Sequence, residues 1–115
     1  GDFLWELVRK NLYILTTNIA GLEASGDVGA LWRDHRNLAK DVAADVLDVQ
    51  EWLTGHRFDR ERLMAGFQEA INADLCHACA GRTAPARLTR AVHHADAAGL
   101  AVPTLRRIAA AQGIV

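Results

Sequence analysis

Apolar residues recur at intervals of three and four along most of the chain, whereas the alternation of apolar and polar residues that marks strands is almost absent. This spacing collects them on one face of a helix, so we expect two long helices in the first half of the chain. Their apolar positions are Leu4, Leu7, Val8, Leu12 and Leu15 in the first, and Leu38, Val42, Val46, Val49 and Leu53 in the second. Between them, the segment 21–29 contains three glycines, which predict a loop or a broken turn.

Three further helices are predicted from their boundary residues. Gly55 suits the left-handed position that ends the second helix, and Asp59 suits the N-cap of the third, with Glu61 in its first turn. Pro85 suits the first turn of a fourth helix, and the segment 98–103 ends that helix before a short last one. The expected inward positions of these three helices are Leu63, Phe67, Ala70, Ile71, Leu88, Val92, Ala95, Leu105 and Ile108.

The sequence therefore predicts an all-α fold, a single domain of four to five helices over residues 1–115. Half of the residues are hydrophobic and 23% are charged, which is typical of a compact globular domain. The net charge of −1 gives no reason to expect a nucleic-acid or anionic-membrane partner.

The expected location follows from what the sequence does not contain. The longest uncharged stretch, residues 11–22, is shorter than the roughly 20 residues of a membrane span, and no signal-peptide pattern is present. We therefore expect a soluble, cytoplasmic protein. The chain begins at Gly1 without a methionine, which suggests a piece of a longer protein.

The only two cysteines of the chain, Cys76 and Cys79, precede an adjacent pair of histidines, His93 and His94. Thiolate and imidazole are ligands that suit zinc. Neighbouring residues on a helix point about 100° apart, however, so at most one of the two histidines would face the cysteines. We interpret the cysteines as small packing residues, expect no bound metal, and keep a small zinc-binding helical protein as an alternative.

The second candidates are Lys10, Asn11 and Asn18, among which Lys10 and Asn18 form a pair. They lie eight residues apart, so on one helix they share a face, with Ile14 between them. Two polar groups on a mostly apolar helix can hold a small polar ligand, with the lysine placed to donate a proton or to stabilise an oxyanion. The alternative is a solvated lysine and an asparagine near the end of a helix.

Five arginines give the last third of the chain a basic bias. They could hold a phosphate or a carboxylate, but a charged outer helix face is the simpler interpretation. These residues are Arg82, Arg87, Arg90, Arg106 and Arg107.

Residues 8–31, VRKNLYILTTNIAGLEASGDVGAL, resemble the C-terminal helical domain of the ketopantoate reductase (2-dehydropantoate 2-reductase) family. That family carries a tryptophan two residues before a lysine, asparagines four and eight residues after the lysine, and Gly-x-Leu about eleven residues after the second asparagine. Lys10 matches the lysine, Asn18 the second asparagine, and 29–31 the Gly-x-Leu. Residues 80–108 resemble the family's Gly-Arg-x-Thr-Glu-Ile segment, the helix after it and the turn before its last helix, with 99–103 the best match.

The resemblance implies a fold like the C-terminal helical domain of 6-phosphogluconate dehydrogenase, and a role in pantothenate biosynthesis. It implies that Lys10 is the catalytic proton donor in the reduction of a small 2-keto acid and that Asn18 binds substrate. It also implies NADPH as the cofactor, bound mainly by an N-terminal Rossmann domain that these residues do not include, and a homodimer formed through the helical half.

The chain departs from the family pattern at four places, one of which is the absence of a Ser-Ser-Met segment near residues 72–75. The tryptophan falls on Val8, the first asparagine on Ile14, and the glutamate after Gly-Arg-x-Thr on Ala84 or Pro85. The resemblance therefore does not specify the substrate. The alternative function is a stand-alone helical interaction domain without enzyme activity, in which the apolar helix faces form a homodimer.

Overall fold

The computed structural model describes residues 2–114, and every regular element in that range is a helix. The single all-α domain is confirmed, with six helices within the described range in place of the four or five predicted. These are α1 (Asp2–Gly21), α2 (Val28–Asp34), α3 (Arg36–Thr54), α4 (Arg60–Ala73), α5 (Ala84–Ala98) and α6 (Pro103–Ala111). Within residues 2–114, no helix is both apolar enough and long enough to cross a membrane.

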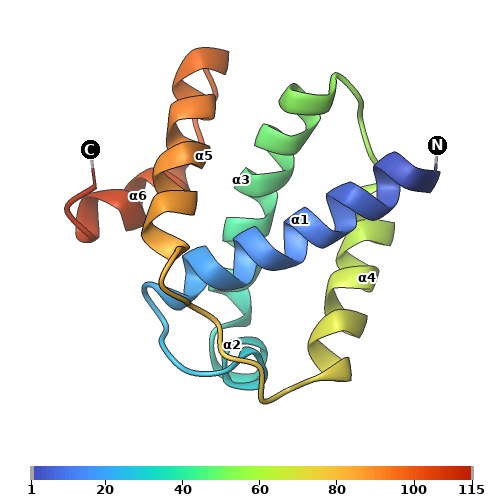
Figure 1. The fold of residues 1–115 in the computed structure, drawn as a ribbon, viewed down its shortest axis with the longest axis vertical. Helices are drawn as coiled ribbons and strands as arrows, with labels where there is room; N and C mark the ends of the chain where they lie inside the picture. The colour runs from blue at the N-terminus through green and yellow to red at the C-terminus, as the bar shows by residue number, and fades with distance from the viewer. Residues whose placement is uncertain (1, 115) are drawn as a thin grey trace.

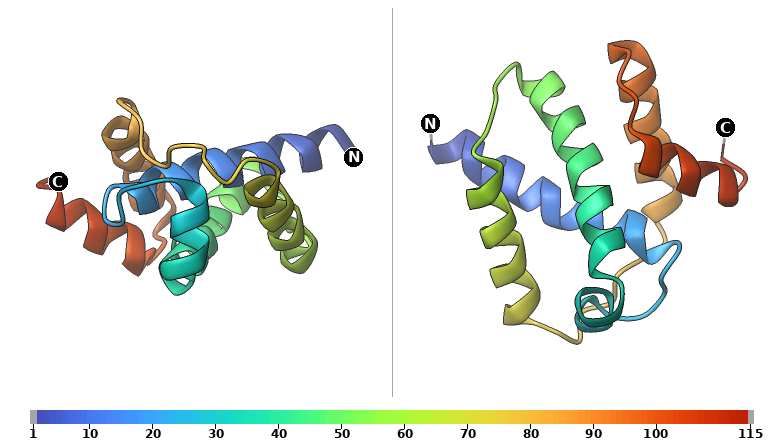
Figure 2. Two further views of the ribbon diagram at one scale, coloured as in Figure 1. Left: turned by 90° about the horizontal axis from the view of Figure 1, so that it is seen from below. Right: turned by 180° about the vertical axis from the view of Figure 1, so that it is seen from behind.

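The first helix is the centre of the fold. α3, α4 and α5 all pack on α1, which runs across α3 and α4 in Figure 1 and lies behind them in the rear view of Figure 2. α6 packs against α3 and α5, and the short α2 lies below, against α1, α3 and α4. The hydrophobic core therefore forms between α1 and the helices that it crosses.

The predicted loop over 21–29 is wrong at its end, where α2 begins at Val28. Asp27 is the N-cap of α2, and its Oδ1 accepts a hydrogen bond of 2.8 Å from the Ala30 amide. Val28, Leu31 and Trp32 bury the inner side of this seven-residue helix. A helix of only two turns is too short to show a clear periodicity, and Gly29 inside it is a poor helix former.

The predicted boundaries of the other helices are confirmed. Gly55 ends α3 in the left-handed conformation, with φ of 69°. Asp59 caps α4 by accepting a hydrogen bond from the Arg62 amide, and Pro85 lies in the first turn of α5.

Most of the predicted inward positions are buried, but two leucines are not. Leu7 of α1 is 42% exposed and Leu53 of α3 is 46% exposed, although both fall on the apolar faces expected from the sequence. Ala70 is half-buried. On α1 and α3, the apolar face therefore extends beyond the part that the other helices of this domain bury.

The linker between α4 and α5, residues 74–83, is tied to the segment before α2. The Val28 amide donates to the His77 carbonyl at 2.8 Å, and the Cys79 amide donates to the Gly26 carbonyl at 3.0 Å. This linker also contacts α1 closely, because a Cβ on Gly21 would lie 2.6 Å from the Cβ of Cys79. Only glycine at position 21 allows the end of α1 to approach the linker so closely.

Asp45 of α3 fixes the start of α6. The residue is only 6% exposed, and its Oδ2 accepts hydrogen bonds from the amides of Thr104 at 2.8 Å and Leu105 at 3.1 Å. These amides belong to the first turn of α6, where unpaired N–H groups need an acceptor. Burial raises the pKa of the Asp45 carboxyl above its usual value near 3.8, although the two amide hydrogen bonds oppose the shift.

This raised pKa predicts how stability depends on pH. The folded state binds a proton at Asp45 at a higher pH than the unfolded chain does, so the contribution of Asp45 to the free energy of unfolding grows as the pH falls towards 3.8. Asp45→Asn keeps an acceptor without the charge. Urea unfolding of both proteins between pH 7 and pH 4 should show the native protein gaining stability relative to the variant as the pH falls. A relative loss of stability over this window would contradict the direction of the pKa shift.

Candidate functional site

The sequence-predicted pair lies on one stripe of α1. Lys10, Ile14 and Asn18 follow one another at intervals of four residues, with Lys10 exposed and the other two half-buried. At about 1.5 Å per residue, the backbones of Lys10 and Asn18 are roughly 12 Å apart along the helix axis. A small ligand that touches both would therefore lie over Ile14.

Asn18 joins three parts of the fold. Its Nδ2 donates to the carbonyl of Cys79 in the linker at 3.1 Å, and its Oδ1 accepts from Nη1 of Arg87 on α5 at 2.8 Å. These bonds fix the orientation of the amide and hold the Arg87 guanidinium beside α1. Asn18 therefore positions Arg87 as well as presenting its own remaining donor.

Lys10 has a different environment, since its side chain makes no hydrogen bond or ion pair with another residue in the described range. It borders an open hollow of about 700 Å³ between α1, α4 and the linker, and Tyr13 and His77 border the same hollow. The Tyr13 and His77 rings lie 6.2 Å apart between centroids. The ammonium is thus free to meet a ligand.

Tyr13 adds a second proton donor to this hollow. Burial raises the pKa of its hydroxyl above the usual value of 10.0, and the nearby Asp74 and Cys79 raise it further. The phenol therefore stays protonated at neutral pH and can donate a hydrogen bond. Chemically, the hollow can stabilise and protonate an oxygen on which negative charge develops.

Ile14 also borders a second groove, of about 550 Å³, between α1, α3 and α5. Arg87 lines it and links it to Asn18. The Lys10–Asn18 stripe therefore separates a hollow with a free lysine from a groove with arginine side chains.

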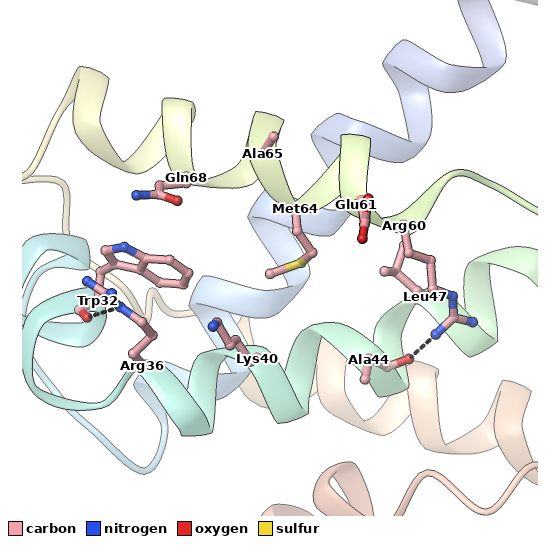
Figure 3. A pocket seen from close by; sticks show the side chains of 10 residues that line it. All are labelled: Trp32, Arg36, Lys40, Ala44, Leu47, Arg60, Glu61, Met64, Ala65 and Gln68. Carbon is pink, nitrogen blue, oxygen red and sulfur yellow. Dashed lines mark hydrogen bonds between the residues drawn. The ribbon is translucent and has the colours of Figure 1, made fainter.

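A third hollow, of about 470 Å³, lies between α3 and α4 and is drawn in Figure 3. Trp32 stands at one end, with the Arg36 guanidinium 4.7 Å from its ring centroid, and Met64 extends from α4 into the space above α3. Arg60, at the other end, is neutralised by ion pairs with two carboxylates of α3. Neither Lys10 nor Asn18 contributes to this hollow.

The two cysteines lie in different environments. Cys79 is 1% exposed and packs against Gly21, as expected of a small packing residue, but Cys76 is exposed, so that interpretation is wrong for Cys76. His93 is exposed, and His94 lies 6.1 Å from Trp52 between ring centroids. Residues 2–114 contain no group of three or more histidine, cysteine or acidic residues arranged to hold a metal ion.

This difference predicts selective alkylation of the native protein. Burial raises the pKa of the Cys79 thiol to about 11, so it has little thiolate at pH 8 and little access to a reagent. Iodoacetamide at pH 8 should modify Cys76 and leave Cys79 unmodified, as measured by mass spectrometry of the peptides. Both cysteines should react once urea unfolds the chain. Equal rates in the native protein would contradict the burial of Cys79.

The sequence indicated the Lys10–Asn18 stripe but not its neighbours. Tyr13 has no distinguishing signal in the sequence, and Arg87 is one of five arginines in the last third of the chain. The contact between Asn18 and Arg87 joins residues 69 positions apart, so only the fold could show it. No sequence pattern predicts that His77 of the linker lies next to Tyr13 of α1.

Comparisons with known proteins found no relative of this chain: no protein-family model, no curated protein and no solved structure matches it.

Proposed function

We propose that this chain is the C-terminal helical domain of an NADPH-dependent reductase of small 2-keto acids, similar to 2-dehydropantoate 2-reductase, in the cytoplasm. The observation that carries the proposal is the state of the Lys10–Asn18 stripe. Lys10 is exposed beside an open hollow and has no protein partner in the described range, while Asn18 is held by two hydrogen bonds. A lysine available for a ligand is what the proposed chemistry needs.

In the proposed reaction, an N-terminal Rossmann domain outside these residues would hold NADPH, which would be the source of the hydride. Hydride addition to the keto carbon leaves negative charge on the carbonyl oxygen. The Lys10 ammonium stabilises that charge and gives its proton to the oxygen, which becomes the hydroxyl of the product. Asn18 binds the polar end of the substrate through the donor that its contacts with Cys79 and Arg87 leave free.

The described residues would contribute substrate binding, the proton and dimer contacts, but not the nucleotide site. A dinucleotide fold places its glycine-rich turn between a strand and a helix. No strand occurs in residues 2–114. The open side of the Lys10 hollow is where a second domain would have to bring the nicotinamide.

The test is an assay of the protein purified from its native source. Oxidation of NADPH should be followed with a panel of 2-keto acids that includes 2-dehydropantoate and pyruvate, with the corresponding 2-hydroxy acids as negative controls. Reduction of at least one 2-keto acid is expected. Absence of NADPH oxidation with every member of the panel would overturn the proposal.

A second candidate function, a helical interaction domain that forms a homodimer, is favoured by the exposed apolar residues. Phe3 is 83% exposed on α1, and Trp52 is 45% exposed next to Leu53 at the end of α3. Trp52 and Leu53 are adjacent exposed apolar side chains, and contiguous exposed apolar surface is typical of a face that a partner covers. Sedimentation equilibrium of the chain measures whether its mass is that of a dimer or of a monomer. If the exposed apolar residues form the dimer contact, Phe3→Ser should shift that mass towards the monomer.

A further inference from the structure

The groove between α1, α3 and α5 has the composition of a binding site for a small anion with an apolar part. Its walls are largely aliphatic, and its volume of about 550 Å³ lies in the range of small-molecule pockets. The aliphatic lining comes from Ile14, Leu15, Val49, Leu53 and Ala91.

One side of the groove is basic. Arg87, Arg90 and His94 follow one another on α5 at spacings of three and four residues, so they share the face that lines the groove. None of the described residues that line it is an aspartate or a glutamate. Arg87 uses Nη1 to donate to Asn18 at 2.8 Å, and Arg90 makes no side-chain hydrogen bond with a described residue. The two guanidinium groups therefore retain most of their donors.

The opposite side offers a buried amide. Gln50 of α3 is only 5% exposed, and its Oε1 accepts a hydrogen bond of 3.2 Å from Nδ2 of Asn11 on α1. Its Nε2 donates to no other residue in the described range, although Gln50 lines the groove. This nitrogen reaches the surface of the groove and keeps its donors, so an anionic ligand there would accept a hydrogen bond from it.

We propose that this groove binds a monocarboxylate that carries a short apolar tail. The carboxylate accepts paired hydrogen bonds from Arg87 and Arg90, because a planar guanidinium matches the two oxygens of a carboxylate. The tail lies along Ile14, Val49 and Leu53, where it replaces water on aliphatic walls. A fully polar anion such as phosphate would gain nothing from those walls. The site adds a ligand class to the proposed function and needs no nucleotide-binding domain.

The probe that tests this site is 4-methylpentanoate, added to the 115-residue chain while calorimetry and backbone amide NMR shifts are recorded. Two matched probes separate the contributions, since acetate lacks the tail and 4-methylpentanamide lacks the charge. We expect 4-methylpentanoate to bind at least about tenfold more tightly than either and to shift amides of α1, α3 and α5. Equal binding of the three probes, shifts that map elsewhere, or no binding would overturn the site.

Variants then assign the residues. Arg90→Gln should raise the Kd for 4-methylpentanoate about tenfold or more, because it removes a charged donor without touching the bond between Arg87 and Asn18. Arg33→Gln is the matched control, since Arg33 is exposed on α2 and pairs only with its neighbour Asp34. An unchanged Kd in Arg90→Gln would overturn the assignment. The reductase assay measures NADPH oxidation and not the binding of 4-methylpentanoate. A negative result in one experiment therefore does not decide the other.

Discussion

Replacing Lys10 by alanine is expected to lower the kcat of the reductase that contains this domain by about 10²–10⁴-fold. The proposed reaction places negative charge on the substrate oxygen, and the free Lys10 ammonium at the edge of the open hollow is the group assigned to protonate it. Because Lys10 is exposed and bonds to no described side chain, its removal should leave the fold unchanged. The rate of NADPH oxidation at saturating substrate measures the effect.

The chain offers a matched control for this experiment in Lys40, its only other lysine. Lys40 is also exposed on a helix but borders the hollow between α3 and α4. Lys40→Ala should keep the native kcat within a factor of about two. Equal turnover in Lys10→Ala and the native protein, with circular dichroism showing the same helix content, would remove Lys10 from the mechanism.

Phe67→Ala is expected to reduce the free energy of unfolding by about 3–5 kcal/mol, a large part of the stability of a small domain. Phe67 of α4 is fully buried, and its ring lies 6.0 Å from Tyr13 on α1 and 5.8 Å from Trp32 on α2 between centroids. Truncation would open a cavity where these three helices meet and remove both aromatic contacts. Urea unfolding followed by circular dichroism gives the change.

Phe3→Ala is the control for this substitution, because it makes the same chemical change on a side chain that is 83% exposed. The free energy of unfolding should change by less than about 0.5 kcal/mol there. A similar loss in both variants would show that Phe67 does not occupy the centre of the core, and so would contradict the packing of α4 on α1 and α2.

Much of the fold could be predicted because the helix signals are local. Gly55, Asp59 and Pro85 act on the backbone next to them, so the ends of α3, α4 and α5 follow from the sequence. α2 could not be predicted in the same way, because its only strong signal is the Asp27 cap and its periodicity is short. Leu7 and Leu53 fit the helical periodicity equally well. They remain exposed, however, because the neighbouring helices do not extend over them.

The candidate site was predictable only along one helix. Periodicity alone places Lys10, Ile14 and Asn18 on one stripe, since all three belong to α1. It contains no information on what packs beside that stripe. The pairing of Asn18 with Arg87 depends on how α5 meets α1. The hydrogen bond between Asn11 and Gln50 depends on how α3 meets α1 in the same way.

The central position of α1 has a consequence for biosynthesis. α1 is synthesised before the other five described helices, which follow over residues 28–111. Asn18 can therefore contact Arg87 only after residue 87 has been made. Contacts so distant in sequence form slowly compared with those of a bundle whose neighbours are consecutive. The apolar stripe of α1 therefore stays partly uncovered until α3, α4 and α5 have all been synthesised.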